Sequence, residues 1–300
     1  MGWFSRWRKG KRQGTNAPRG GFNFWGGRRY LDNVSYFLPK DDVEINRLDF
    51  QHYLLRYALR GNFAAPIVRP SSILDVGCGT GRWAMEMARA YPEANVIGID
   101  LLPPPSEEHL RQLAATDPRP ENYVYLQANA LDGLPFPNDT FDFVHQRLLV
   151  AGIPVARWPD EVRDLLRVTR PGGWLELVEA IPASGGPAMN QLREWLVGVG
   201  LPRGVDIRTT HQISQYLQAS GARNIEYREL NVQMGKGGGR VGMMMETNYF
   251  SLHAGIRGVA LAQGLTTPKI FDATIQRAQQ EIATGRYVWP YYLAYGQRPE

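Results

Sequence analysis

Residues 75–81 read Asp75-Val76-Gly77-Cys78-Gly79-Thr80-Gly81. The apolar pair Ile73 and Leu74 before this glycine loop predicts a short buried strand, and an apolar pattern with helical spacing starts at Trp83. Glycine is needed where a ligand approaches the backbone too closely for a Cβ, or where a turn requires a positive φ. A glycine-rich turn from a strand into a helix therefore predicts a cofactor site.

Two common motifs of this kind do not fit. A dinucleotide-binding fingerprint would place its third glycine at position 82, which is Arg82 here, and no Gly-Lys-Ser/Thr follows to make a phosphate-binding P-loop. Asp100 ends the next predicted strand, at the spacing of about 20 residues at which an acidic residue binds ribose hydroxyls. The loop and Asp100 together predict a cofactor that carries a ribose.

Predicted strands and helices alternate around the loop. Strands are predicted at residues 73–76, 95–100, 123–126, 141–145 and 174–180, with helices between them, one of which runs from Ser106 to about Ala115. This alternation is typical of a parallel sheet covered by helices on both faces. The later sequence predicts helices at 189–199, 210–219, 241–261 and 269–282, and strands at 225–232 and 288–295. We therefore expect one doubly wound α/β domain with helices inserted late in the chain.

The positive charge is concentrated at the N-terminal end. The net charge is +5, but residues 1–29 hold eight lysines and arginines and no acidic residue, so the remainder carries −3. A mildly acidic body argues against a nucleic-acid-binding face. The N-terminal segment is also rich in aromatic residues and glycine. It is interpreted as a mobile terminus, a lid over the substrate, or a peripheral contact with an anionic membrane. Because residues 1–28 show no helical or strand period, we expect their removal to leave a folded core.

Other features exclude several classes of protein. Cys78 is the single cysteine, which excludes a disulfide within the chain and a cysteine-built zinc site. No pair of histidines has metal-ligand spacing, so no metal is expected. There is neither an apolar signal segment nor a run of about 20 apolar residues, so a soluble, cytoplasmic protein is expected.

Five motifs occur in the order of one family. They are the glycine loop, Gly98-Ile99-Asp100, Leu134-Pro135-Phe136, Phe141-Asp142-Phe143-Val144 and Arg170-Pro171-Gly172-Gly173-Trp174. With this combination, residues 71–180 resemble the class I S-adenosylmethionine-dependent methyltransferases. The resemblance implies a Rossmann-like, mostly parallel seven-stranded sheet with an antiparallel last strand.

The resemblance also implies a domain organisation. Residues 1–35 would be a basic aromatic tail or lid, and residues 36–300 a single methyltransferase domain with its cofactor-binding core at about 71–180. Substrate-side helical insertions would occupy about 181–222 and 234–285, and the last strand about 286–297. The protein would be a monomer or a homodimer.

The cofactor implied is S-adenosylmethionine, which leaves as S-adenosylhomocysteine. Gly77, Gly79 and Gly81 would let its methionine and ribose parts approach the backbone, with Cys78 as the small residue between them. Asp75 would help to hold the ammonium group.

The adenosine end would be bound further along the chain. Asp100 would accept hydrogen bonds from both ribose hydroxyls, and Leu101 would pack on the adenine. The family often has an acidic residue where this chain has Asn129, beside Ala130. The Asn129 carbonyl can still accept a hydrogen bond from the adenine amine; a strand-end cap is its alternative role.

A narrower resemblance involves the segment before the core. Tyr36-Phe37-Leu38-Pro39, Arg47-Leu48-Asp49-Phe50-Gln51-His52 and the final Tyr292-Leu293-Ala294-Tyr295-Gly296-Gln297-Arg298-Pro299 are similar to the fungal velvet-complex methyltransferases that control secondary metabolism, and to their bacterial relatives. This similarity places the helix near the cofactor and does not name a substrate.

The chemistry is expected where the strand at 141–145 ends. His145, Gln146 and Arg147 follow there and would face the transferred methyl group. His145 is the candidate general base and a candidate cofactor contact, with a purely structural histidine as the alternative. Arg147 would bind a substrate carboxylate or form a peripheral salt bridge. Further candidates for substrate contact are Tyr30, Tyr36, Met244 and Tyr249, with core packing as the alternative for the last two.

Three functions remain open. The leading hypothesis is methyl transfer to a small, partly apolar metabolite by in-line displacement. The others are a regulatory, non-catalytic protein with the same fold and, least favoured, a nucleic-acid methyltransferase. The last would carry an Asn/Asp-Pro-Pro-aromatic motif where this chain has His145-Gln146-Arg147.

Overall fold

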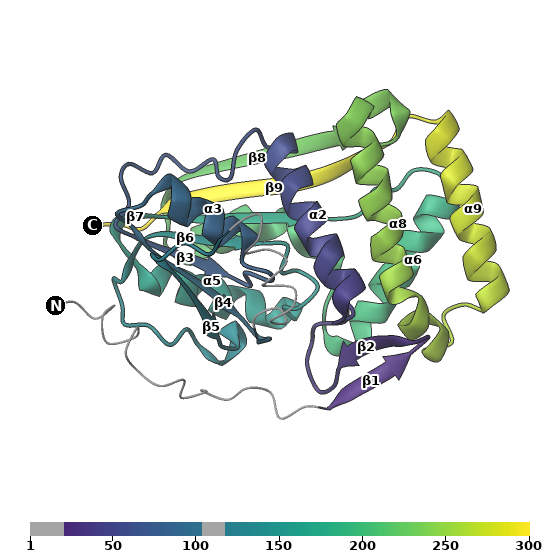
Figure 1. The fold of residues 1–300 in the computed structure, drawn as a ribbon, viewed down its shortest axis with the longest axis horizontal. Coiled ribbons are helices and arrows are strands. Elements are labelled where there is room, and N and C mark those ends of the chain that lie inside the picture. Colours follow the sequence, from purple (N-terminus) through teal and green to yellow (C-terminus); the bar gives the residue numbers. More distant parts are fainter. Residues whose placement is uncertain (1–20, 104–117) are drawn as a thin grey trace.

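The computed structural model describes residues 21–103 and 118–300, which build a seven-stranded sheet with helices on both faces (Figure 1). The strand order is β5-β4-β3-β6-β7-β9-β8. The strands are β3 (Ser72–Val76), β4 (Asn95–Asp100), β5 (Tyr123–Gln127), β6 (Phe141–Arg147), β7 (Thr169–Ala180), β8 (Arg223–Gln233) and β9 (Val288–Gln297). β9 is antiparallel to both of its neighbours, and the pairs among β3 to β7 are parallel. The expected fold class is confirmed; the helix predicted at 106–115 lies outside the described residues.

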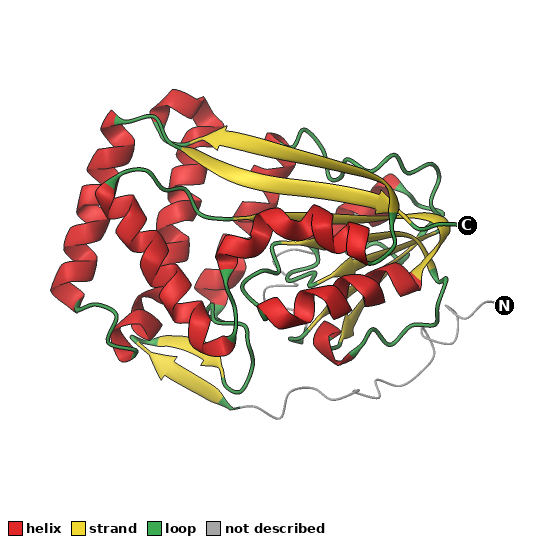
Figure 2. Ribbon diagram, turned by 180° about the vertical axis from the view of Figure 1, so that it is seen from behind, coloured by secondary structure: helices red, strands yellow, loops and turns green. Residues whose placement is uncertain are grey.

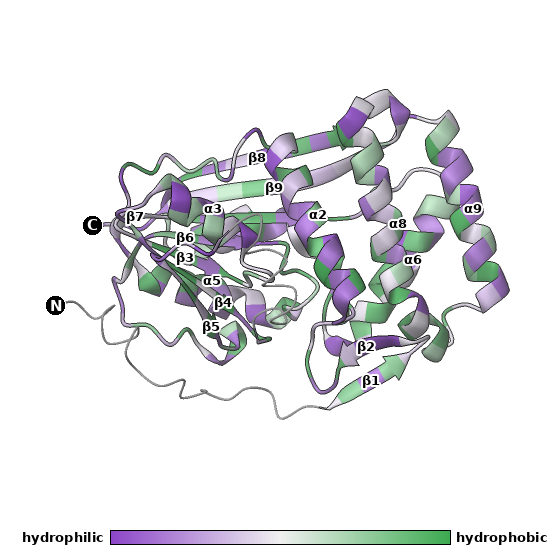
Figure 3. Ribbon diagram, viewed as in Figure 1, coloured by the Kyte–Doolittle hydropathy of each residue, from purple (hydrophilic) through white to green (hydrophobic). Residues whose placement is uncertain are grey.

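The alternation of side chains along the strands divides the core into two layers. On one face, Ile73 and Phe143 pack with Trp83 of α3 (Arg82–Ala90). On the other face, Leu74 and Val144 belong to the cluster that includes the buried side of α5 (Trp158–Val168). Figure 3 shows the hydrophobic character of these central strands.

A helical layer lies beyond the sheet. It contains α6 (Pro187–Gly200), α8 (Gly239–Ala262) and α9 (Pro268–Thr284), and α2 (Asp42–Ala58) lies between it and the sheet (Figure 1). The long strands β8 and β9 run side by side toward this layer (Figure 2). Within the described residues, the remaining helical pieces are α7 (Ile213–Ala219) and 3₁₀ turns at Ala130–Asp132, Val155–Arg157, Leu201–Arg203, Ile207–Gln212 and Lys236–Gly238.

The segment before α2 contains a β-hairpin that sequence analysis did not predict. β1 (Phe22–Trp25) pairs with β2 (Arg28–Leu31) through Gly26-Gly27, both with positive φ. The Tyr30 hydroxyl donates a 2.7 Å hydrogen bond to the carbonyl of Gly255 in α8. The Arg28 guanidinium also binds the Asp41 carboxylate at 2.5 Å and 2.7 Å. The expectation of no strand in residues 1–28 is therefore wrong for residues 22–25 and for Arg28, where β2 begins. Truncation after residue 28 would remove one strand of a docked hairpin.

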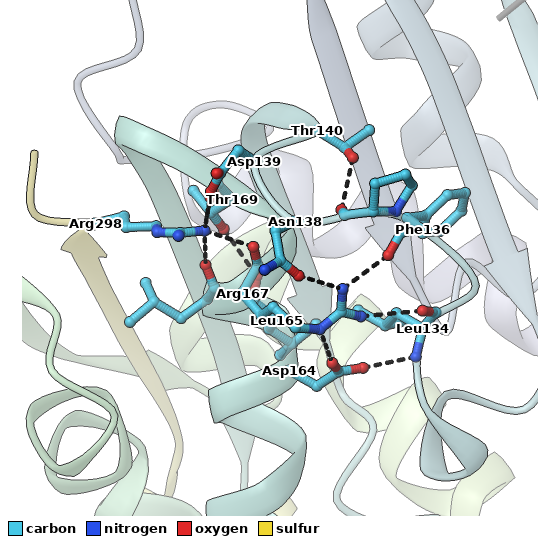
Figure 4. A network of polar contacts seen from close by, with 12 residues as sticks. Leu134, Phe136, Asn138, Asp139, Thr140, Asp164, Leu165, Arg167, Thr169 and Arg298 are labelled. Carbon is cyan, nitrogen blue, oxygen red and sulfur yellow. Dashed lines mark hydrogen bonds and ion pairs between the residues drawn. The ribbon is translucent and has the colours of Figure 1, made fainter. Parts of the chain in front are cut away.

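Two arginines hold the connection from β5 to β6 and the end of the chain (Figure 4). Arg167 of α5 donates to the carbonyls of Leu134 at 3.0 Å and Phe136 at 2.8 Å. Arg298 donates to the carbonyls of Arg167 and Thr169, both at 2.5 Å. The Leu134-Pro135-Phe136 motif is therefore fixed to the end of α5, because Arg167 donates to two of its backbone carbonyls.

The topology places a crevice at one edge of the sheet. From β3 the chain builds outward through β4 and β5, and then returns to add β6 on the other side of β3. In open α/β sheets, ligands bind beyond the carboxyl ends of the strands where the order reverses in this way. Here that point lies between the glycine loop after β3 and the segment after β6.

Candidate cofactor and acceptor site

A cavity of about 380 Å³ opens at this crevice. The volume lies within the range of small-molecule sites. The walls come from the glycine loop, residues 33–40, α2, residues 147–153 and the late-chain elements α6, α8 and β9.

The glycine loop faces this cavity with its backbone. Gly77, Gly79 and Gly81 have φ values of 68°, 56° and 79°, which other residues rarely adopt. A Cβ at Gly77 would lie 2.3 Å from the Leu149 side chain, and one at Gly81 would lie 2.2 Å from the Tyr123 hydroxyl. At Gly79 the nearest atom would be 3.8 Å away. Gly77 and Gly81 are thus needed for the protein's own packing, whereas Gly79 leaves open space for a ligand. Gly81 itself does not line the cavity.

Asp100 lies at the carboxyl end of β4, on the cavity wall. Its carboxylate accepts hydrogen bonds from the backbone N–H of Gly79 at 2.8 Å and of Leu102 at 3.0 Å. Each carboxylate oxygen has a second lone pair for another donor. The geometry fits two ribose hydroxyls.

The predicted adenine residues also reach the cavity. Leu101, Asn129 and Ala130 all line it. The Asn129 side-chain carbonyl accepts a hydrogen bond from the N–H of Leu131 at 3.2 Å, so it caps the short helical turn that follows. Both roles considered for Asn129 are compatible with this position, because its oxygen has a second lone pair.

Asp75 connects the cavity to a buried histidine. Asp75 lines the cavity, and its Oδ1 lies 3.0 Å from Nδ1 of His145 on the neighbouring strand. The His145 ring stacks on Trp83 at 3.8 Å between ring centroids and 5° between planes. Burial lowers the pKa of His145, although the Asp75 carboxylate acts in the opposite direction. A neutral imidazole that donates to Asp75 is the state favoured by this environment.

The position of His145 corrects one expectation. Its side chain is buried and is absent from the cavity wall, so it does not face the site of the transferred methyl group. The physical reason is Trp83, which covers the ring on the helix side of the sheet. Arg147, two residues further along the same face, does reach the cavity.

Of the other predicted substrate residues, only Tyr36 and Arg147 line the cavity. Gln146 is buried on the opposite face of the sheet, as the alternation along a strand requires. Tyr30 is bound to Gly255, and Met244 and Tyr249 pack in the core around α8. The substrate roles expected for these four residues therefore have no geometric support.

Sequence analysis missed several residues of the cavity. Lys40, Leu196, Leu252, Trp289 and Tyr291 all lie on its wall. In β9, Trp289 and Tyr291 alternate with more exposed neighbours, and this period of two was the available signal for an inward face.

Two further properties concern only the residues that the structure describes. Within residues 21–103 and 118–300, no group of three or more His, Cys, Asp or Glu side chains is placed to hold a metal ion. In the same ranges, no helix is both long enough and apolar enough to span a bilayer.

The sequence is similar to those of known methyltransferases. Residues 73–173 match the family model of a methyltransferase domain. The N-methyltransferase sirN of Leptosphaeria maculans is 29% identical over 234 residues, which cover 73% of this chain and 78% of sirN. The secondary metabolism regulator laeA of Aspergillus fumigatus is 36% identical over 146 residues, which cover 48% of this chain and 36% of laeA. For several curated relatives, the match spans less than half of their length.

A solved structure supports the fold. Phosphoethanolamine N-methyltransferase 2 of Haemonchus contortus, in complex with phosphomonomethylethanolamine and S-adenosylhomocysteine, is similar with a TM-score of 0.50. The identity is 16%, and the similarity covers 91% of this chain and 62% of that chain. The fold and the glycine loop resemble those of the class I S-adenosylmethionine-dependent methyltransferases, and residues 73–173 match a methyltransferase domain. Its curated relatives include fungal methyltransferases of the laeA type.

Proposed function

We propose that the protein transfers a methyl group from S-adenosylmethionine to a small, partly apolar metabolite. The observation that supports this most directly is the continuity of one cavity. It joins the glycine loop and Asp100 at one end to the side chains of Leu196, Leu252 and Trp289 at the other. A cofactor and an apolar acceptor would thus share one cavity.

The residues at the first end fit the cofactor. The open space at Gly79 allows the cofactor to approach the backbone of the loop. Asp75 offers a carboxylate to the cofactor's ammonium group, and Asp100 accepts hydrogen bonds from its ribose. S-adenosylmethionine supplies an electrophilic methyl group in an in-line displacement. The protein's main task is then to align the acceptor and keep water out.

His145 is proposed to position Asp75. Its Nδ1–H donates to the Asp75 carboxylate, and the stack on Trp83 fixes the ring. A general base is needed only when the acceptor must lose a proton. The buried position of His145, away from the cavity wall, does not favour it as that base.

The names of the curated relatives favour a role in secondary metabolism. One is an N-methyltransferase and another a regulator of secondary metabolism. The second name also favours the alternative of a regulatory protein that binds the cofactor without turnover. An assay for transfer therefore has to distinguish the two.

We expect S-adenosylhomocysteine to form when the protein and S-adenosylmethionine are incubated with a panel of aromatic carboxylic acids, phenols, amines and thiols. Leu196→Trp, which fills the acceptor end, should lower kcat/KM at least about tenfold and leave cofactor affinity unchanged. Leu201→Trp is the matched control, because Leu201 is 48% exposed and lies outside the cavity. Cofactor binding with no transfer to any acceptor would favour the regulatory alternative. Transfer only to added protein or RNA would contradict the small-molecule proposal.

A further inference from the structure

Arg147 is a cation inside the cavity with no acidic partner among the described residues. It is the last residue of β6, and its guanidinium has one recorded hydrogen bond, from Nη2 to Nδ1 of His52 at 3.0 Å. Burial lowers the pKa of Arg147, while the charges of Asp75, Glu86, Tyr291 and Glu176 act in the opposite direction without forming an ion pair with it. An arginine has five N–H donors, so most of the hydrogen-bonding capacity of Arg147 remains available to a ligand.

The neighbours of Arg147 orient it without neutralising it. Nε2 of His52 lies 3.2 Å from the Glu86 carboxylate, which leaves Nδ1 of His52 as an acceptor for Arg147. Burial opposes ionisation of Glu86, but hydrogen bonds from His52 and Asn62 lower its pKa to about 2. Glu86 also pairs with Arg56. The negative charge of Glu86 is thus compensated by Arg56 and by hydrogen bonds from His52 and Asn62. The His52 imidazole separates Glu86 from Arg147.

Among the described residues, the other cations of the cavity wall are Lys40, Arg47, Arg82 and Arg157, and Arg157 donates a hydrogen bond to the carbonyl of Leu131. Arg47 donates from Nε and Nη2 to Glu44 and from Nη1 to Asn248. Arg82 lies 3.2 Å from Asp49. The Lys40 ammonium lies 4.7 Å from the centre of the Tyr36 ring, and Asp100 acts on it electrostatically.

The acceptor end contains one more unused donor. Nε1 of Trp289 is buried and has no hydrogen-bond acceptor among residues 21–103 and 118–300. Trp289 and Tyr291 line the cavity, and the Arg147 charge acts on the Tyr291 hydroxyl. A buried donor without a partner is costly, although this atom presents almost no surface to the cavity. The unused groups of Arg147 and Trp289 are donors, and the apolar side chains of Leu196 and Leu252 line the same cavity.

We propose that the methyl acceptor is a small monocarboxylate with an apolar or aromatic body, whose carboxylate pairs with Arg147. This inference rests on the methyl transfer proposed above and specifies its substrate class. The guanidinium fork matches the two oxygens of a carboxylate. The one charge of Arg147 matches the one charge of a carboxylate, whereas Lys40 and Arg157 on the same wall contact the Tyr36 ring and the Leu131 carbonyl. The apolar body would lie against Leu196, Leu252 and Trp289.

One other carboxylate could reach Arg147, that of the cofactor's methionine part. The acceptor's carboxylate and the cofactor's carboxylate would form the same ion pair with Arg147, so the test has to measure the binding of each ligand separately. Binding of S-adenosylhomocysteine reports on the cofactor source. Binding of an added acid to the protein saturated with S-adenosylhomocysteine reports on the acceptor source.

The test compares cinnamate with cinnamamide by calorimetry, using protein saturated with S-adenosylhomocysteine. The two probes have the same aromatic body and differ in charge. We expect cinnamate to bind at least about tenfold more tightly, as a charge-assisted bidentate pair implies. In Arg147→Met this preference should disappear while affinity for S-adenosylhomocysteine stays within about threefold; Arg147→Lys should retain part of it. Arg163→Met, at an exposed ion pair with Asp160, is the charge-matched control.

Each contrary outcome has a distinct meaning. Equal binding of the two probes to the wild-type protein overturns the inference without any variant. A preference that survives in Arg147→Met also overturns it. A loss of S-adenosylhomocysteine affinity in both Arg147 variants would assign the pair to the cofactor and overturn the acceptor role. Failure of the wild-type protein to bind S-adenosylhomocysteine would instead contradict the proposed function.

Discussion

Asp100→Ala is expected to weaken the binding of S-adenosylhomocysteine about 100-fold or more. The Asp100 carboxylate is proposed to accept hydrogen bonds from two ribose hydroxyls. A hydrogen bond to a charged group contributes about 1.5–3 kcal/mol. Together, about 3–6 kcal/mol corresponds to a factor of roughly 10² to 10⁴ in the dissociation constant. The same carboxylate also holds the N–H groups of Gly79 and Leu102, so its loss would loosen the glycine loop.

Calorimetric titration of the two proteins with S-adenosylhomocysteine measures this effect. Asp160→Ala serves as the matched control, because Asp160 is exposed and is not part of the cavity wall. Asp100→Asn should fall between the wild type and Asp100→Ala, since the amide keeps one acceptor and loses the charge. An affinity of Asp100→Ala within threefold of the wild type would remove Asp100 from the cofactor site.

His145→Ala is expected to lower cofactor affinity about tenfold. The substitution removes the donor to Asp75 and the ring that stacks on Trp83, so the Asp75 carboxylate loses its orientation toward the cavity. The loss of one hydrogen bond to a charged group is worth about 1.5–3 kcal/mol, which sets this scale. His145→Asn should recover most of the affinity, because its amide nitrogen can occupy the place of Nδ1.

The general-base hypothesis for His145 predicts a different pattern. His145→Ala would then lower kcat by about 10²–10⁴ and leave cofactor affinity unchanged, and His145→Asn would not restore turnover. A base must be neutral, so the rate would fall as the pH drops through its pKa. Because burial lowers the pKa of His145, that acidic limb would lie below the ordinary value of about 6.5. Cofactor titrations and pH–rate profiles of the two variants separate the two roles.

The cofactor half of the site was predictable because its signals are local in sequence. Residues 75–81 combine a buried strand, three positive-φ glycines and a helix start, and Asp100 follows one strand later. Each of these constraints acts within about 25 residues of chain. The fold class follows from the same alternation of strands and helices.

The acceptor half could not be derived in the same way, because distant elements form it. Trp289 and Leu252 come from β9 and α8, and nothing near them in sequence shows that they face the glycine loop. His145 and Arg147 point to the same face of β6, so alternation alone cannot tell which of them is open. Trp83, on a helix 62 residues before His145, covers the imidazole ring and leaves Arg147 as the residue that reaches the cavity.

The β1–β2 hairpin is a different case, because the signal was present. Phe22 and Phe24 alternate with polar Asn23, and Gly26-Gly27 separates them from Arg28. A two-residue Gly-Gly loop between alternating segments is a hairpin pattern. The high positive charge of the segment favoured the interpretation as a tail instead.

The central claim is that this chain binds S-adenosylmethionine through the loop after β3. The most direct test is the thermal unfolding of the full chain with S-adenosylhomocysteine or with NADH, each at rising concentration. At 100 times its dissociation constant, a ligand of the folded state adds about 2.7 kcal/mol to the free energy of unfolding. We predict a rise in Tm with S-adenosylhomocysteine that increases with concentration, and no rise with NADH. A rise with NADH and none with S-adenosylhomocysteine would contradict the account.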